Sequence, residues 1–181
     1  MPPLPTTSHK AYERYDIMSN LDSTRLREVL DYCPQTGVFT WRQQVRKTIS
    51  VGDVATTNKS HGYLRIRIGR RLFQAHRLAW LYVHGVWPAH VIDHINGDRA
   101  DNRIGNLRDV TQQVNIQNQR GPIRSSSSGL LGACKDKQSG KWRSQITIEG
   151  VNQYLGLFET AQQAHEAYLS VKRQVHEGCT I

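Results

Sequence analysis

The sequence predicts an α+β fold built from two small modules, and three observations support that prediction. Short strands with a two-residue hydrophobic period alternate with short amphipathic helices. A stretch rich in Ser, Gly and Pro at residues 121–128 separates two such groups. The length of 181 residues suits one domain or two small ones. We therefore expect a flexible tail at 1–19, a first module at 20–120, a linker at 121–128 and a second module at 129–181.

Hydrophobic spacing predicts the elements of the first module in order. A helix capped by Asp22 or Ser23 carries Leu26, Val29 and Leu30 on one face. The strand over 64–68 alternates apolar residues with Arg65 and Arg67, so one of its faces is cationic. The other expected elements are strands at 38–41, 72–74, 91–92 and 107–110, a helix over 75–84, and a helix from Thr111 to about Asn118.

The second module has the pattern of a small antiparallel sheet of three strands packed on one helix. Residues 142–148 alternate, Glu149-Gly150 turns the chain, and 152–157 returns. Thr160-x-x-Gln163 is a capping box that opens a helix with an Ala-rich stripe, and Gly178 ends this helix.

The positive charge gathers in the middle of the chain. The whole sequence has 24 Lys and Arg against 15 Asp and Glu, a net charge of +9. Residues 61–120 contain nine basic and four acidic residues, and all nine bases are Arg, whose planar fork can grip phosphate at two points. This predicts a nucleic-acid contact in the middle third. A solvated, salt-bridged surface is the alternative that charge alone leaves open.

Several classes of protein are disfavoured by composition. No apolar run is long enough for a membrane span, and the N-terminus lacks the pattern of a signal peptide, so we expect no membrane contact. The three cysteines form no C-x-x-C pair, which argues against a cysteine-based zinc finger and fits a reducing compartment.

Asp93 and His94 form the one constellation that suggests catalysis. They stand side by side at the end of an apolar strand, and Asn115 follows on a predicted helix. Asp93 and Asn115 offer oxygen ligands to a hard cation, and His94 can accept a proton from water near neutral pH. Because neighbouring strand residues point to opposite faces, both can serve one site only if the strand ends or bends there. The alternative is that Asp93 and His94 have a purely structural role, as hydrogen-bonding residues of a turn.

Residues 76–115 resemble the HNH endonuclease family with the ββα-metal fold, in its phage and homing branch. The residues that carry this resemblance are His76-Arg77-Leu78, Val91 to Asp98, Asp101-Asn102, Asn106-Leu107-Arg108, Val110-Thr111 and Asn115. The resemblance implies that Asp93 and Asn115 bind the divalent metal, Mg2+ or alternatively Mn2+. It further implies that His94 is the general base and that Asn106 braces the loop and keeps the base oriented. Asn115 stands where the family name expects a final His.

Residues 129–178 resemble a second family, the plant-type Apetala-two DNA-binding domain. The resemblance rests on Gly132, Lys135, Lys141-Trp142-Arg143, Ile146, Gly150, Leu155-Gly156, Phe158, Thr160-Ala161, Ala164 and Ala167-Tyr168. It implies a sheet that lies in the major groove with the helix behind it. The candidate DNA contacts in this module are Lys135, Lys137, Lys141, Trp142, Arg143, Gln145 and Thr147. In the first module they are Arg65, Arg67, Arg70, Arg71 and Arg108.

The sequence as a whole predicts a metal-dependent DNA endonuclease of phage or homing type, acting on double-stranded DNA as a monomer or weak dimer. We expect it to be phage-encoded and to act in the cytoplasm of a bacterial host. The alternative is a non-catalytic DNA-binding regulator or packaging accessory with a vestigial nuclease fold. An RNA-directed enzyme is disfavoured, because no exposed aromatic stacking motif is evident. We expect His76 to be structural, and Asp98 and Asp101 to shape the loop or approach the metal.

Overall fold

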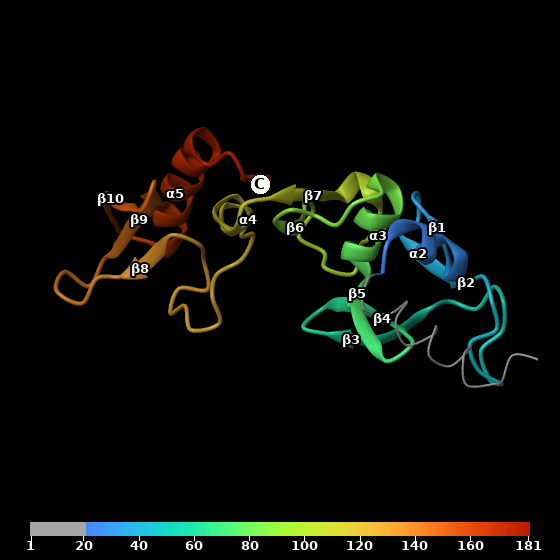
Figure 1. Cartoon of the computed structure of the whole chain (residues 1–181). Coiled ribbons are helices and arrows are strands. Elements are labelled where there is room, and N and C mark those ends of the chain that lie inside the picture. Colours follow the sequence, from blue (N-terminus) through green and yellow to red (C-terminus); the bar gives the residue numbers. More distant parts are fainter. Residues whose placement is uncertain (1–20) are drawn as a thin grey trace, which may run out of the picture. The chain divides into compact units, whose positions relative to one another are not determined.

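The computed structural model describes residues 21–181, and it combines short helices with small sheets (Figure 1). This confirms the predicted α+β class, with small antiparallel sheets. The predicted tail at 1–19 lies outside the described residues. Contacts divide the chain into two compact units: the first runs to His94 and includes 98–108, and the second contains 95–97 and 109–181.

The first unit begins with a helix that gives way directly to a strand. Helix α2, Ser23–Val29, is capped by Asp22, whose carboxylate accepts from the Arg25 amide at 2.8 Å. The prediction that Leu30 belongs to this helix was wrong, because Leu30 is extended and starts strand β1, Leu30–Cys33. Strand β1 pairs antiparallel with β2, Val38–Trp41, which the sequence did predict.

A second sheet carries the arginine-bearing strand. Its order is β3 (Thr56–Ser60), β4 (Tyr63–Ile68) and β5 (Arg71–Gln74), and β3 was not predicted. In β4, Ile66 and Ile68 are buried while Arg67 is exposed, which confirms the predicted alternation. The apolar face therefore joins the core and leaves a cationic side at the surface.

Helix α3, Ala75–His84, is the centre of the first core. Its Leu78, Ala79 and Leu81 are at most 1% exposed, and they belong to one buried cluster with residues of α2, β1, β2 and β4. After α3 comes β6, Val91–His94, which forms a two-stranded sheet with β7, Leu107–Val110. The connection between them ends in a single 3-10 turn, Ile104–Asn106.

The second unit contains the predicted sheet of three strands. The strands are β8 (Ala133–Lys135), β9 (Trp142–Ile148) and β10 (Val151–Phe158), antiparallel in the order β10-β9-β8. Helix α5, Ala161–Val175, contacts all three strands and opens with the predicted capping box. It ends earlier than predicted, at Val175 rather than Gly178, with the His176 amide donating to the Lys172 carbonyl.

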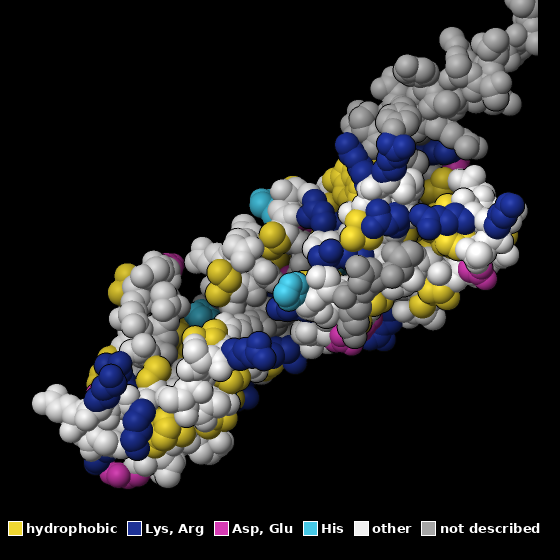
Figure 2. All heavy atoms as spheres, turned by 90° about the horizontal axis from the view of Figure 1, so that it is seen from below, with side chains coloured by type: hydrophobic (Ala, Val, Ile, Leu, Met, Phe, Trp, Pro, Cys, Tyr) yellow, Lys and Arg dark blue, Asp and Glu magenta, His cyan; other side chains and the backbone are white. Residues whose placement is uncertain are grey.

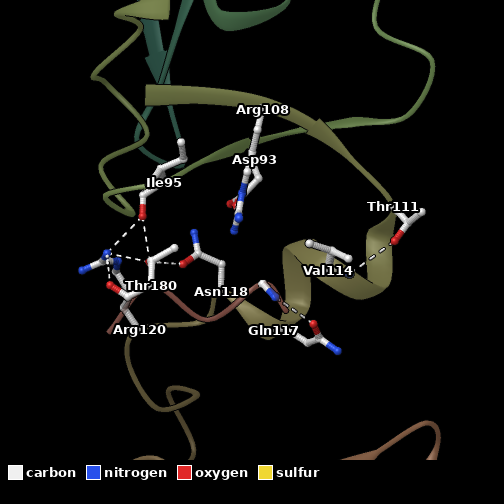
Figure 3. Close-up of polar contacts among 10 residues, drawn as sticks. Asp93, Ile95, Arg108, Thr111, Val114, Gln117, Asn118, Arg120 and Thr180 are labelled. Carbon is white, nitrogen blue, oxygen red and sulfur yellow. Dashed lines mark hydrogen bonds and ion pairs between the residues drawn. The ribbon is translucent and has the colours of Figure 1, made fainter. Parts of the chain in front are cut away.

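Helix α4, Gln112–Gln117, follows a Thr111 cap and belongs by contacts to the second unit. The end of the chain contacts this helix (Figure 3), where the Gly178 amide donates to the Gln117 side chain at 3.0 Å. Thr180 Oγ1 and an Arg120 amino group both donate to the Ile95 carbonyl, at 2.9 and 3.0 Å. The Lys172 ammonium donates to the Gln119 carbonyl at 2.6 Å. The boundary between the two compact units thus falls before α4. The sequence instead predicts a linker at 121–128, and that linker stays a prediction.

Gly132 provides a direct stability test of the second unit. A Cβ at this position would lie 2.1 Å from Cγ of Tyr168 on α5, and its φ is +71°. We expect Gly132→Ala to destabilise the unit by about 1–3 kcal/mol through overpacking, in addition to the strain of the left-handed backbone. Urea denaturation monitored by circular dichroism measures it.

Gly140→Ala is the matched control, because Gly140 has the same φ of +71° but nothing within 4 Å of the added Cβ. It should show the backbone strain alone. Equal losses for the two variants would contradict the packing explanation.

Candidate functional site

His94 lies at the end of β6, and its imidazole is held by an asparagine side chain. The ring is only 4% exposed, and its Nε2 lies 3.3 Å from Oδ1 of Asn102. When Nε2 donates to this amide oxygen, it carries the proton, and Nδ1 of the neutral ring is then the acceptor. The contact thus favours the tautomer in which Nδ1 can take a proton.

Asn102 is itself fixed by the first core. It is 1% exposed, and its backbone carbonyl accepts a 2.7 Å hydrogen bond from the Tyr32 hydroxyl. Gly37 (φ +73°) packs so closely that an added Cβ would lie 2.5 Å from the Asn102 carbonyl carbon. No role for Asn102 was predicted from the sequence. In the sequence, only its position in the HNH-like motif marked Asn102. Its contact with His94 spans eight residues of an irregular loop, so no regular spacing predicts it.

Tyr63 and His76 complete the surroundings of His94. The His76 and His94 rings meet edge to face with centroids 5.1 Å apart, and Tyr63 lies 5.1 Å from His76 and 5.9 Å from His94. Burial lowers the pKa of His94, opposed by the Asn102 hydrogen bond and the Asp93 charge. Burial, and then the charges of His94 and Arg77, lower the pKa of His76 to about 3. Both imidazoles are therefore neutral at neutral pH.

The depressed pKa of His76 makes folding stability depend on pH. Unfolded His titrates near 6.5, so between about pH 6.5 and 3 the unfolded chain binds a proton that the folded chain does not. Stability should therefore fall as pH falls through this window, with a contribution of up to about 1.4 kcal/mol per unit. His76→Gln should flatten the slope partially, because His94 titrates in the same direction. The measurement is urea unfolding from pH 7 to 4, and a slope that His76→Gln leaves unchanged would contradict the assignment.

Asp93 precedes His94 in β6 and forms an ion pair with the neighbouring strand. Nε and Nη2 of Arg108, on β7, each lie 2.8 Å from Oδ2 of Asp93 (Figure 3). Strand β6 ends at His94, which is the condition for both residues to serve one site. Their side chains engage different partners, Asp93 with Arg108 and His94 with Asn102. Arg108, a predicted DNA contact, is thus paired with Asp93, a predicted metal ligand.

The loop after β6 is shaped by its own polar side chains. Asn106, 8% exposed, donates from Nδ2 to the Asp101 carbonyl at 2.8 Å. The Asp98 carboxylate accepts from the Ala100 amide, and the Asp101 carboxylate binds Arg103 through both backbone and guanidinium. These bonds give Asn106 a bracing contact in the loop and fit the loop-shaping alternative for Asp98 and Asp101.

Asn115 lies half-buried on α4, in the other compact unit from Asp93. Its pairing with Asp93 at one metal ion therefore stays a prediction. Among residues 21–181 there is no cluster of three or more His, Cys, Asp or Glu side chains able to hold a metal. The candidate donors, one carboxylate and one carboxamide, are hard oxygens that suit Mg2+ or Mn2+ when water or phosphate completes the shell. The chemistry of the donor set therefore fits the predicted ion, with an incomplete protein shell.

Four of the five predicted DNA contacts of the first module cluster around one hairpin. Arg67 is exposed and Arg65 half-buried on β4, and Arg70 and Arg71 are exposed at the turn into β5. The face drawn in Figure 2 carries many more basic than acidic side chains. This arrangement keeps these four arginines as candidates for contact with phosphate.

The alternation of β9 divides the predicted DNA contacts of the second unit. Ser144 and Ile146 are buried, so Arg143, Gln145 and Thr147 lie on the opposite face. Trp142 shares the parity of Ser144 and Ile146, and the Lys135 ammonium lies 4.7 Å from its ring centroid. The Lys141 ammonium pairs with Glu159, and Lys137 is exposed in the turn before β9.

The strand opposite adds a residue that the sequence analysis missed. Tyr154, 62% exposed, pairs with Gln145 in the register, and the exposed Leu157 pairs with Arg143. Tyr154 therefore shares the open face with Arg143, Gln145 and Thr147. The sequence showed an aromatic residue in the strand that returns after the turn, and this feature could have marked Tyr154 as a candidate.

Comparison with known proteins finds similarity to nucleases over part of the chain. Residues 73–117, which include Asp93, His94, Asn106 and Asn115, match the family described as HNH endonuclease. DNA endonuclease I-HmuI of Bacillus phage SP01 is 35% identical over 92 residues, covering 48% of this chain and 49% of that protein. Protein 3.8 of Escherichia phage T7 is 34% identical over 76 residues, covering 41% of this chain and 62% of that protein.

A solved structure described as DNA binding and cleavage by the HNH homing endonuclease I-HmuI aligns with 83% of this chain and 88% of its own, at 24% identity and a TM-score of 0.40. The chain spans about half the length of curated I-HmuI. Among the described residues, no helix is long and apolar enough to cross a membrane. The match to the HNH endonuclease family model is therefore confined to residues 73–117.

Proposed function

We propose that this chain is a metal-dependent HNH endonuclease of phage or homing type that hydrolyses a phosphodiester bond in double-stranded DNA. The observation that carries the proposal is the buried His94 imidazole, which Asn102 holds in the tautomer that leaves Nδ1 as acceptor. Its neighbour Asp93 and the family match over residues 73–117 point in the same direction.

In this mechanism His94 takes a proton from water at Nδ1 while that water attacks a backbone phosphate. Asp93 and Asn115 would hold Mg2+, with Mn2+ as the alternative. An ion held there would supply positive charge to the phosphodiester and to the departing 3′ oxygen. Asn106 keeps the loop in place through its bond to the Asp101 carbonyl. One site per chain implies nicking of one strand at a time, so a double-strand break needs a second chain or a second event.

Two surfaces are proposed to hold the DNA. The hairpin of Arg65, Arg67, Arg70 and Arg71 grips phosphate in the nuclease module. The Apetala-two-like module offers the open sheet face of Arg143, Gln145 and Thr147, now joined by Tyr154, with Lys137 at its edge. Trp142, Lys135 and Lys141 are weaker candidates there, because each is already engaged within the chain. We propose a monomer or weak dimer that is phage-encoded and acts in the cytoplasm of a bacterial host.

Supercoiled plasmid provides the test of the activity. Incubation with the full chain and Mg2+ should convert it to open circles, and EDTA should prevent the conversion. If no DNA, cognate phage DNA included, is nicked under any divalent metal, the proposal is overturned.

Asn102→Ala tests the proposed orientation of the base. We expect kcat to fall roughly 10- to 100-fold with little change in KM, because the neutral ring can then adopt the wrong tautomer or rotate. Asn102→Asp, which keeps an acceptor oxygen, should recover part of kcat. A rise in KM together with the fall in kcat, without recovery by Asp, would point instead to general unfolding of the loop.

A non-catalytic DNA-binding regulator remains the second candidate, and one observation favours it. The Asp93 carboxylate already has a cationic partner in Arg108, which is what a protein that never binds metal would also show. Titration with Mn2+ separates the two: the nuclease binds the ion near His94, whereas a pure regulator does not.

A further inference from the structure

The Arg108–Asp93 ion pair joins two residues that the proposed function uses separately, and the inference drawn from it rests on that function. We propose that Arg108 occupies the Asp93 carboxylate in the metal-free protein, yields it to the divalent cation, and is thereby released to bind DNA phosphate. Arg108 is then a residue that tunes metal affinity and couples it to DNA binding.

The Arg108 guanidinium contacts the carboxylate oxygen of Asp93 that a divalent cation would also bind. Nε and Nη2 of Arg108 both lie 2.8 Å from Oδ2 of Asp93. The Asp93 side chain is 6% exposed and that of Arg108 is 26% exposed. A buried carboxylate is strongly unfavourable without a positive partner, so the pair stabilises the site until another cation arrives.

The two cations cannot share this carboxylate at close range. Guanidinium groups keep their positive charge throughout the physiological pH range, so loss of a proton cannot relieve this competition. A divalent ion on Asp93 would stand within a few ångströms of the guanidinium and repel it. Metal binding and the Arg108–Asp93 contact are therefore competing equilibria, and the affinity for metal is lower than Asp93 alone would give.

A second arginine–aspartate pair, Arg103 with Asp101, differs from Arg108–Asp93 in its exposure and in the role of its carboxylate. Arg103 pairs with Asp101, but its side chain is 53% exposed and the same carboxylate also accepts from the Arg103 backbone amide. This pair shapes the loop and does not occupy a proposed metal ligand. Displacement by metal is thus specific to Arg108, whose half-buried position on β7 keeps the released guanidinium beside the site.

The test is Mn2+ binding to the DNA-free full chain, measured by electron paramagnetic resonance of free Mn2+. Arg108→Gln should tighten Mn2+ binding roughly tenfold. Arg25→Gln, which removes the same charge from the exposed pair with Glu28 on α2, should leave Mn2+ affinity unchanged. Unchanged or weaker Mn2+ binding by folded Arg108→Gln would overturn the proposal. Structural damage alone would weaken binding, so it cannot imitate the expected gain.

The wild-type chain gives a second readout that does not depend on a variant that folds. In nitrogen-15 spectra, the Arg108 Nε–H signal should move and lose its protection from exchange as Mg2+ saturates the protein. A signal that stays unchanged at saturation contradicts displacement. The DNA arm compares duplex affinity in Ca2+ and in EDTA: Arg108→Gln should weaken binding more in Ca2+, and an equal loss in both would overturn the release of Arg108 to phosphate.

Asp93→Asn separates failure of this inference from failure of the proposed function. If Mn2+ binding survives Asp93→Asn, the proposed metal site is wrong, and the inference falls with it. If Asp93→Asn abolishes Mn2+ binding while Arg108→Gln leaves it unchanged, the metal site stands and only the competition is refuted.

Discussion

His94→Ala is expected to reduce DNA cleavage by roughly 10²- to 10⁴-fold, the usual contribution of a positioned general base. The physical reason is the loss of Nδ1, the nitrogen that the Asn102 contact leaves as acceptor. DNA affinity should change little, because His94 is buried and the proposed phosphate contacts lie on other side chains. The rate is measured as nicking of supercoiled plasmid under saturating Mg2+.

His84→Ala is the matched control, since it removes an exposed imidazole from the end of α3. It should cleave like the wild type. Thermal unfolding of both variants shows whether each is folded at the assay temperature. A folded His94→Ala protein that nicks DNA at the wild-type rate would disprove the assignment of the base.

Asp93→Asn is expected to lower cleavage at least about 100-fold at millimolar Mg2+, because the carboxamide keeps an oxygen but loses the charge that attracts the ion. DNA affinity should be equal to or higher than that of the wild type, since Arg108 loses its anionic partner. The measurement is the nicking rate against Mg2+ concentration, together with fluorescence anisotropy of a labelled duplex.

The control for Asp93 is Asp98→Asn in the adjoining loop. The Asp98 carboxylate accepts from the Ala100 amide and is proposed only to shape the turn. It should retain cleavage at the same Mg2+ requirement. A loss as large as that of Asp93→Asn would make Asp98 a metal ligand and would revise the donor set.

Elements whose pattern is local could be predicted closely from the sequence. Helix α3 and strands β7 and β9 have the expected bounds, because hydrophobic periodicity and helix caps depend on residues that are close in the sequence. Strands β1 and β3 were missed, since each is defined by pairing with a partner strand. Leu30 shows the conflict directly: its spacing suits the α2 face, but pairing with Trp41 makes it extended.

The candidate site could be predicted by residue type but not by contact. Asp93 and His94 stand out in the sequence because a carboxylate and an imidazole interrupt an apolar, arginine-rich segment. The hydrogen bond from His94 to Asn102 depends on how an irregular loop folds back against Tyr32 and Gly37, and no spacing rule predicts it. The Arg108–Asp93 pair depends likewise on the alignment of β6 with β7.

The central claim is that water, activated by His94, breaks the bond to a 3′ oxygen. Cleavage in water enriched in oxygen-18, followed by mass spectrometry of the new DNA ends, tests it most directly. The mechanism predicts one labelled oxygen in a new 5′-phosphate and an unlabelled 3′-hydroxyl. A label in a 3′-phosphate, or a new end without label, would contradict it.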